Sequence, residues 1–113
     1  GKTKEQATKQ KLKEIIMPKA YWIGIVDVKN QEEYKKYADI AGPALIKAGA
    51  KILSRGGKIK NLEGREIDRI VIIEFSSMEK AEIFYNSEEY KKGLKFLNLE
   101  VADRFLNIAE GID

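Results

Sequence analysis

The sequence contains no cysteine and no histidine. Without cysteine, neither a disulfide framework nor thiol chemistry is available. Without histidine, the chain lacks the commonest general base, the commonest metal ligand and the usual pH-sensitive side chain. A conventional serine–histidine triad is therefore excluded, and haem and zinc lose their usual ligand. We expect no cofactor and no metal site.

Long apolar runs are missing as well. No segment approaches the roughly 20 residues of a membrane-spanning helix, and no basic start leads into an apolar stretch of signal-peptide length. We therefore expect a cytoplasmic protein that does not bind a membrane. The 113 residues, 43% of them hydrophobic, suffice for one domain with one core.

The basic excess lies at the N-terminus. Residues 1–16 contain five Lys and two Glu, which equals the formal net charge of +3, and residues 17–113 carry 16 basic and 16 acidic groups. A nucleic-acid-binding domain normally has a basic face of its own, so we expect no nucleic-acid partner. Residues 1–16 are expected to be a tag remnant or a helical arm with Leu12, Ile15 and Ile16 on its apolar side. Residues 17–113 are expected to form the domain.

A strand followed by a capped helix occurs twice, and the first copy begins at Ala20. Residues 20–28 are apolar on both faces, which is typical of a central strand covered on both sides. Asn30 with Glu33 favours a helix start directly after it. This helix is expected to run to about Lys47, with a bend or interruption at Gly42-Pro43 because proline lacks the amide donor.

The second copy is preceded by a bent strand. Residues 50–54 form a strand that we expect to continue beyond Arg55-Gly56-Gly57, because a glycine pair inside a strand marks a bulge or bend. A hairpin turn at residues 61–64 then leads into a third strand at residues 68–75. That strand is again apolar on both faces, so it should also be central.

The remaining elements follow from caps and breaks. Ser76 with Glu79 predicts a capping box for the next helix, which continues to Tyr85. Ser87 can cap a short further helix after the break at Asn86-Ser87. Residues 101–110 supply the last strand.

The order of strand, helix, strand, strand, helix, strand predicts an α+β fold. It is the ferredoxin-like split βαβ arrangement (βαββαβ), a four-stranded antiparallel sheet with the helices on one face. The other face stays apolar along the central strands, and a contiguous apolar patch of that size marks an interface. We therefore expect a homodimer in which two chains pack through their open sheet faces.

Arg55 is the first candidate ligand-binding residue. It precedes Gly56 and Gly57, which would let a bound anion approach the backbone while the guanidinium anchors it. The alternative is a bulge at which Arg55 pairs with a local acid such as Glu63 or Glu74.

Glu74 is the one candidate for a catalytic base, because it sits near the end of an otherwise apolar strand. General-base catalysis would need burial of this carboxyl group. The alternative is a structural ion pair between Glu74 and Arg55, Arg69 or Arg104. Arg104 is itself a second candidate anion ligand.

Aromatic residues are candidates for the wall of a cleft between helices and sheet. Tyrosine hydroxyls orient ligands and lose little entropy on binding. The residues are Tyr21, Trp22, Tyr37, Tyr85 and Tyr90. Each of them can equally be a packing residue, and Trp22 can lie in the dimer interface, where tryptophan is enriched.

Several short segments recur in the same order in a known bacterial family. They are Met17-Pro-Lys-Ala-Tyr-Trp, Tyr34 with Tyr37, Ser54-Arg-Gly-Gly57, Leu62-Glu-Gly64, Arg69-Ile-Val-Ile-Ile-Glu-Phe75, Phe84-Tyr-Asn-Ser-Glu-Glu-Tyr90, Arg104 and Glu110-Gly111. Together they resemble the family called domain of unknown function 1330, over about residues 17–113. The resemblance departs at residues 93–97, where family members often have Ala and Arg.

The resemblance implies membership of the dimeric α/β-barrel superfamily, whose relatives include cofactor-free monooxygenases and muconolactone-type isomerases. It implies a fold and a cleft, but no established activity. One function hypothesis is therefore a homodimer that binds a small anionic or aromatic molecule, with a cofactor-independent oxygenase- or isomerase-like enzyme as its catalytic version. The other is a purely structural interaction module.

Overall fold

The computed structural model describes residues 3–9 and 17–112. Its elements are, in order, β1 (Ala20–Val28), α2 (Gln31–Lys47), β2 (Lys51–Arg55), β3 (Arg69–Phe75), α3 (Met78–Tyr85), α4 (Glu88–Leu94) and β4 (Ala102–Glu110). Residues 4–9 are also helical, and residues 3–9 are exposed. Leu12, Ile15 and Ile16, the expected apolar side of an N-terminal arm, lie outside the described residues.

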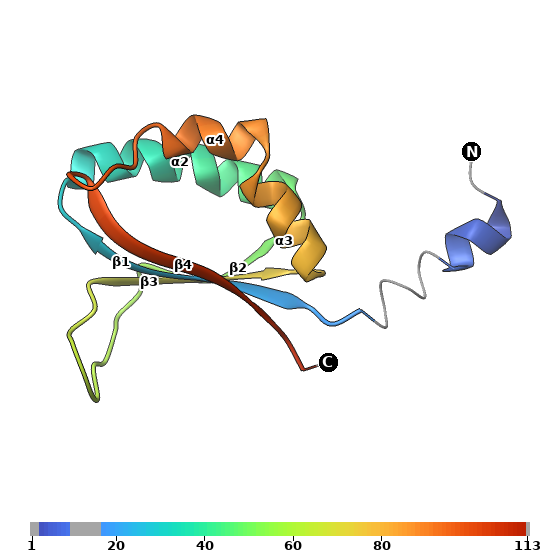
Figure 1. Cartoon of the computed structure of the whole chain (residues 1–113), viewed down its shortest axis with the longest axis horizontal. Coiled ribbons are helices and arrows are strands. Elements are labelled where there is room, and N and C mark those ends of the chain that lie inside the picture. The colour runs from blue at the N-terminus through green and yellow to red at the C-terminus, as the bar shows by residue number, and fades with distance from the viewer. Residues whose placement is uncertain (1–2, 10–16, 113) are drawn as a thin grey trace.

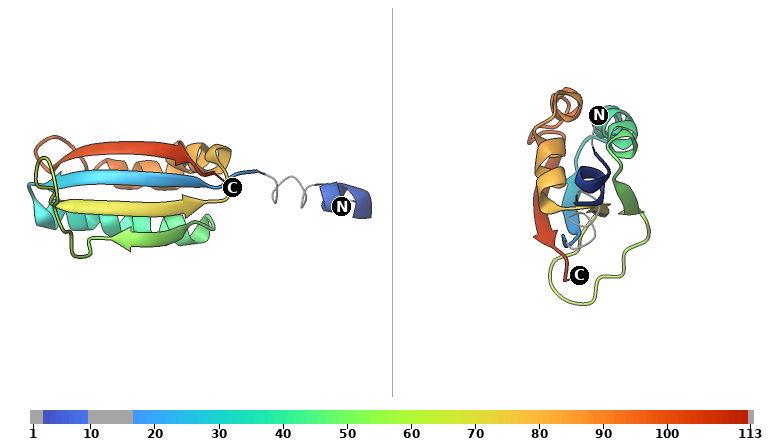
Figure 2. Two further views of the ribbon diagram at one scale, coloured as in Figure 1. Left: turned by 90° about the horizontal axis from the view of Figure 1, so that it is seen from below. Right: turned by 90° about the vertical axis from the view of Figure 1, so that its right-hand side faces the viewer.

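The four strands form one antiparallel sheet in the order β2-β3-β1-β4. All three labelled helices lie on one face of this sheet, and the other face is open (Figure 1; Figure 2, left). This arrangement confirms the ferredoxin-like prediction. It also confirms that the two strands with apolar residues on both faces, β1 and β3, are the central ones. In the described part of the chain, no helix is long and apolar enough to cross a membrane.

Helix α2 begins as predicted but is not interrupted. The Asn30 side chain accepts a hydrogen bond from the Glu33 backbone amide at 3.1 Å, which caps the helix. Of the bend or interruption expected at Gly42-Pro43, the interruption is wrong, because α2 is continuous to Lys47 with Pro43 inside it. Pro43 is exposed, so the carbonyl group that loses its helical partner can be solvated.

Strand β2 is shorter than predicted. It ends at Arg55, and residues 56–68 form a loop instead of the second half of a bent strand. Gly56 has a φ of +66°, a left-handed conformation that favours glycine and ends the extended path. The irregularity in the strand lies earlier, between Ile52 and Ser54. The loop extends past the sheet on the side away from the helices (Figure 1).

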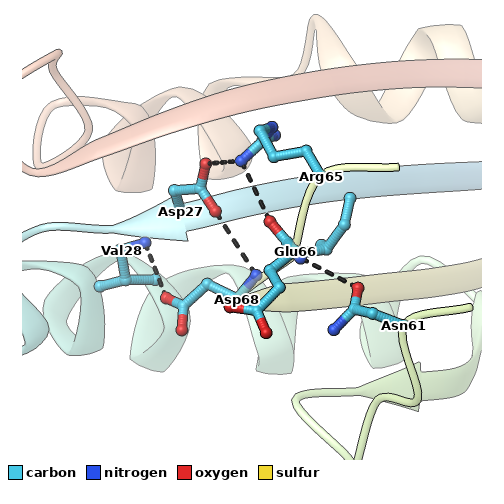
Figure 3. A network of polar contacts seen from close by, with 7 residues as sticks. Asp27, Val28, Asn61, Arg65, Glu66 and Asp68 are labelled. Atoms are coloured by element: carbon cyan, nitrogen blue, oxygen red, sulfur yellow. Dashed lines mark hydrogen bonds and ion pairs between the residues drawn. The ribbon is translucent and has the colours of Figure 1, made fainter. Parts of the chain in front are cut away.

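This loop is fastened to the end of β1 (Figure 3). The Asp27 carboxylate pairs with the Arg65 guanidinium and accepts a hydrogen bond from the Asp68 amide at 3.4 Å. In return, the Asp68 carboxylate accepts a hydrogen bond from the Val28 amide at 3.0 Å. These contacts fix the chain directly before Arg69, the first residue of β3.

A break separates the last two helices, α3 and α4, as predicted. Ser87 caps α4 by accepting a hydrogen bond from the Tyr90 amide at 3.2 Å. The expected cap of α3 at Ser76 with Glu79 is one residue too early, because Ser77 is the N-cap and accepts from the Lys80 amide at 3.2 Å. Ser77 has the extended backbone that an N-cap requires.

The core lies between the helices and the sheet and is rich in aromatic rings. Trp22 of β1 packs edge-on against Tyr90 of α4, with ring centroids 5.2 Å apart, and against Phe84 of α3 at 5.7 Å. Phe84 also contacts Phe75 of β3 at 5.8 Å. Trp22 is therefore a core residue on the helical face of the sheet, and the alternative that it lies in a dimer interface on the open face is wrong.

Phe84 and its neighbour Ile83 form a matched pair on α3 for a stability test. Phe84 is 4% exposed and Ile83 is 57% exposed. We expect Phe84→Ala to lower the free energy of unfolding by about 3–5 kcal/mol, because it leaves a cavity among the aromatic rings. Ile83→Ala should change it by less than about 0.5 kcal/mol. Urea unfolding of both variants checks this, and equal losses would contradict the described core.

Candidate functional site

A cavity of about 40 Å³ lies between α2 and the sheet. Small residues of α2 form part of its roof, at Ala38, Ala41 and Gly42, and Gly24 of β1 lies in its floor. The remaining lining residues are Trp22, Val26, Tyr34, Tyr37, Leu45, Arg55, Arg69, Val71, Ile73, Arg104 and Leu106. The cavity is thus mostly apolar but is bordered by three arginines.

The sheet register brings two of these arginines to either side of β1. Arg69 of β3 and Arg104 of β4 both pair with Val26 of β1. Because neighbouring strands are about 4.8 Å apart, the two backbone positions are separated by about 10 Å. Arg55 of β2 pairs with Val71, one pleat repeat further along β3.

None of the three arginines pairs with a carboxylate of the described residues. Arg104 Nη1 donates hydrogen bonds to the hydroxyl oxygens of Tyr37 and Tyr90, each at 3.0 Å. The Arg69 guanidinium lies over the Tyr34 ring, with Cζ 5.2 Å from the centroid. Its Nε is buried and has no hydrogen-bond partner among the residues described. The site therefore holds positive charge that these parts of the chain do not neutralise.

Two glycines make room for the guanidinium groups. A Cβ atom at Gly56 would collide with Arg69 Nη1, and one at Gly42 would lie 3.4 Å from Arg55 Nη1. Gly56 therefore serves the site indirectly, by letting Arg69 pack against the turn that ends β2.

The tyrosines of the site remain neutral at physiological pH. Burial raises the pKa of Tyr37 strongly, the nearby Tyr90 hydroxyl raises it further, and Arg104 opposes the shift. Burial likewise raises the pKa values of Tyr90 and Tyr34, against the effect of Arg104 and Arg69 respectively. These hydroxyls can donate or accept hydrogen bonds, but they do not supply the negative charge that the arginines lack.

Four of the residues expected from the sequence meet at this cavity. They are Trp22, Tyr37, Arg55 and Arg104. Tyr85 does not line it. Its ring packs at a tilt against Trp22, with centroids 5.9 Å apart, and it borders a separate open groove with Arg104. Gly57 lies apart too, since a Cβ there would meet no atom within 4 Å.

Glu74 lies on the other side of the sheet. It pairs in register with Tyr21, whereas its neighbour Ile73 lines the cavity, and successive residues of a strand point to opposite faces. Its carboxylate lies 3.6 Å from Lys19 Nζ and 3.5 Å from the Tyr21 hydroxyl. The expected ion pair of Glu74 with an arginine does not form within the described chain, and neither does that of Arg55 with Glu63.

Sequence reasoning missed three residues of the site. They are Tyr34, Arg69 and Gly24, of which the sequence suggests only Arg69 as a possible ion-pair partner of Glu74. The signal for Arg69 is its spacing, because it alternates with Val71 and Ile73 on the covered face of β3. The signal for Gly24 is a glycine inside an apolar central strand, which marks a close approach or a gap.

The fold and the site together define a small ferredoxin-like α+β protein with a cationic cavity under its helices. The chain belongs to the family described as Domain of unknown function (DUF1330), whose model matches residues 19–112. This confirms the family resemblance seen in the sequence. No protein with curated annotation matches the chain.

Several solved structures share the fold. A protein of unknown function from Rhodopseudomonas palustris has a TM-score of 0.69 at 18% identity, covering 100% of this chain and 96% of that one. A dimeric ferredoxin-like protein of unknown function from Bacteroides fragilis has a TM-score of 0.55 at 14% identity, covering 81% and 95%. One from Thermobifida fusca, also described as dimeric, has 0.53 at 11% identity, covering 84% and 92%.

The raised pKa of Tyr37 predicts how stability depends on pH. The hydroxyl proton of Tyr37 binds more tightly in the folded state than in the unfolded state. It therefore stabilises the folded state fully below the ordinary tyrosine pKa of about 10, and this stabilisation is lost as the pH rises further. We expect Tyr37→Phe to be less stable than wild type by about 1–3 kcal/mol at pH 8, because it removes the Arg104 and Tyr90 hydrogen bonds. The difference in unfolding free energy between wild type and Tyr37→Phe should become smaller above about pH 10. Urea unfolding between pH 8 and 11 measures it; a constant difference would contradict the shift.

Proposed function

We propose that this protein binds a small anionic molecule in the cavity between α2 and the sheet, in the cytoplasm. The observation that supports this best is the convergence of Arg55, Arg69 and Arg104 on one cavity without a carboxylate partner among the described residues. Moving a cation out of water costs free energy unless an opposite charge or hydrogen-bond acceptors replace the lost solvation. A bound anion would supply both, and it would also give the buried Arg69 Nε an acceptor.

Binding is better supported than catalysis. The described residues that line the cavity include no Asp or Glu, and its tyrosines have raised pKa values. The one candidate base from the sequence, Glu74, lies on the opposite face of the sheet. The geometry therefore favours recognition of an anion over abstraction of a proton by Glu74.

The anion would enter from the side of α2 and β2. An open groove of about 430 Å³ lies there and shares Ala38, Gly42, Arg55 and Arg69 with the cavity. Arg55 is exposed, and Arg69 and Arg104 are partly buried. The exposed Arg55 would attract an anion at the surface, and the partly buried Arg69 and Arg104 would bind it once it has lost its water.

Thermal shift with acetate, benzoate and inorganic phosphate at one ionic strength tests the proposal. A ligand that binds only the folded state raises the melting temperature with its concentration. We expect a dose-dependent rise for at least one probe. Arg69→Met and Arg104→Leu should both abolish the rise. Without anion, Arg69→Met should be as stable as wild type or more stable, because a cation without a carboxylate partner is replaced by an apolar group. Arg104→Leu should be less stable than wild type, because it removes the hydrogen bonds to the Tyr37 and Tyr90 hydroxyls.

Lys80→Gln is the matched control for these variants. It removes one positive charge from an exposed residue of α3 that does not line the cavity. The anion-dependent rise should persist in this variant. No rise for any probe in wild type, or an equal loss in Lys80→Gln, would refute the binding site.

We also propose that two copies pair through the open sheet face. Ile23, Ile25, Ile70 and Ile72 form an apolar centre on this face, and Phe105 beside them is 62% exposed. Apolar surface of this kind is rarely left in water. The structures from Bacteroides fragilis and Thermobifida fusca that share this fold are described as dimeric, which supports an assembly of two chains.

Light scattering during gel filtration tests the pairing. Wild type should elute with the mass of two chains, and Ile25→Asp with the mass of one, because a carboxylate would be desolvated in the interface. Ile83→Asp, an equal change on an exposed residue of α3 on the helical side, should leave the dimer intact. A monomeric wild type at micromolar concentration would overturn this proposal.

A further inference from the structure

The cavity has a cationic end. Arg69 and Arg104 flank Val26 in one row across the sheet. Tyr34 lies over the first guanidinium, and the Tyr37 hydroxyl accepts a hydrogen bond from the second. The polar side chains at this end are two cations, Arg69 and Arg104, and the neutral hydroxyls of Tyr34, Tyr37 and Tyr90. An anionic group therefore fits here, and a neutral one leaves the two positive charges without a counter-charge.

The opposite end of the cavity is apolar. Four residues further along the same strands, Trp22 pairs with Ile73, and Leu45 of α2 completes the wall. Trp22 is 2% exposed and Ile73 is 2% exposed, so this end is closed to solvent. A ligand that fills both ends therefore needs a charged head and an apolar tail.

Gly24 lies between the two ends, in the row between Val26 and Trp22. A Cβ atom here would lie 3.7 Å from Val71 and 3.8 Å from Leu106, which are ordinary contacts. An alanine would therefore fit, and it would suit a strand better than glycine does. The side chain that is missing from this central strand leaves space in the floor of the cavity.

The size of the cavity limits the tail. A cavity needs about 10–15 Å³ of free space to hold one water molecule, so the whole cavity of about 40 Å³ holds roughly three. A carboxylate with a methyl- or ethyl-sized tail is of this size, whereas one that carries an aromatic ring is larger and does not fit unless side chains move. A planar carboxylate fits the planar guanidinium fork through two parallel hydrogen bonds, and inorganic phosphate, which the fork also matches, has no apolar tail for the other end of the cavity.

We infer that the ligand is a short-chain carboxylate whose head binds between Arg69 and Arg104 and whose methyl- or ethyl-sized tail lies over Gly24 toward Trp22. Gly24 is then the residue that determines specificity for the tail. This inference rests on the proposed anion site and assigns its ligand class. It places no catalytic role on any residue.

Titration of the full chain with sodium formate, acetate and propionate, followed by two-dimensional NMR at one ionic strength, tests the inference. Formate has a head and no tail, so it reports on the arginines alone. In wild type, we expect Kd to fall by about fourfold for each added carbon, the usual effect of burying a methylene group. The amide signals of Gly24 and its neighbours should shift with acetate and propionate.

Gly24→Ala should remove this preference selectively. Its methyl group takes up the space over the strand, so acetate and propionate should bind no better than formate, while formate binds as in wild type. Ile73→Val enlarges the apolar end by one methyl group and should shift the preference to butyrate. Ile73→Val thus changes the preference for tail length in the opposite direction from Gly24→Ala, in a protein that keeps its core.

The outcomes separate the two proposals. If formate, acetate and propionate bind wild type equally well, or if Gly24→Ala weakens all three alike, the tail assignment is wrong and the anion site stands. If no carboxylate binds wild type while phosphate does, the inference fails and the anion site again stands. If no anion binds, the proposed function itself fails.

Discussion

Arg104 connects three elements that are far apart in the sequence. Its guanidinium extends from β4 and donates hydrogen bonds to Tyr37 of α2 and Tyr90 of α4, and the two hydroxyls also contact each other at 2.9 Å. Tyr90 is fully buried. Because a buried arginine needs acceptors, and buried hydroxyls need partners, the spacing of both helices above the sheet is set by this cluster. The same spacing sets the distance between the roof of the cavity and the sheet.

The same cluster explains why the cavity is cationic and not merely polar. Neutral tyrosine hydroxyls satisfy some guanidinium hydrogens but leave the charge in place. A carboxylate in their position would stabilise the arginine more and would close the site to external anions. Tyrosine at these positions therefore leaves the guanidinium charge without a counter-charge and stabilises the folded protein less than a carboxylate would.

The sequence predicts the architecture well because each large element has a local signal. Apolar residues on both faces identify β1 and β3 as central, and the caps at Asn30 and Ser87 locate two helix starts. The errors come from proline and glycine, whose effects depend on context. Pro43 stays inside α2 because its side of the helix is exposed, and Gly56 ends β2 instead of bending it.

The site is only partly predictable, for a different reason. Trp22, Tyr37, Arg55 and Arg104 stand out by type, but their common cavity depends on which face of each strand the helices cover. A shift of one residue moves a side chain to the other face, which is what separates Glu74 from Arg69 although both belong to β3. Gly24 contributes by lacking a side chain, so only the packing around it shows its role.

Residues 56–68 leave the sheet after Arg55 and return immediately before Arg69. Both ends of this loop are thus arginines of the cavity, while its middle extends beyond the open face of the sheet (Figure 1). Side-chain contacts through Asp27 and Asp68 fasten the loop to the end of β1, and the Gly56 amide donates to the Ile70 carbonyl of β3 at 3.4 Å. One stretch of backbone thus joins the open side of the sheet to two arginines on its covered side.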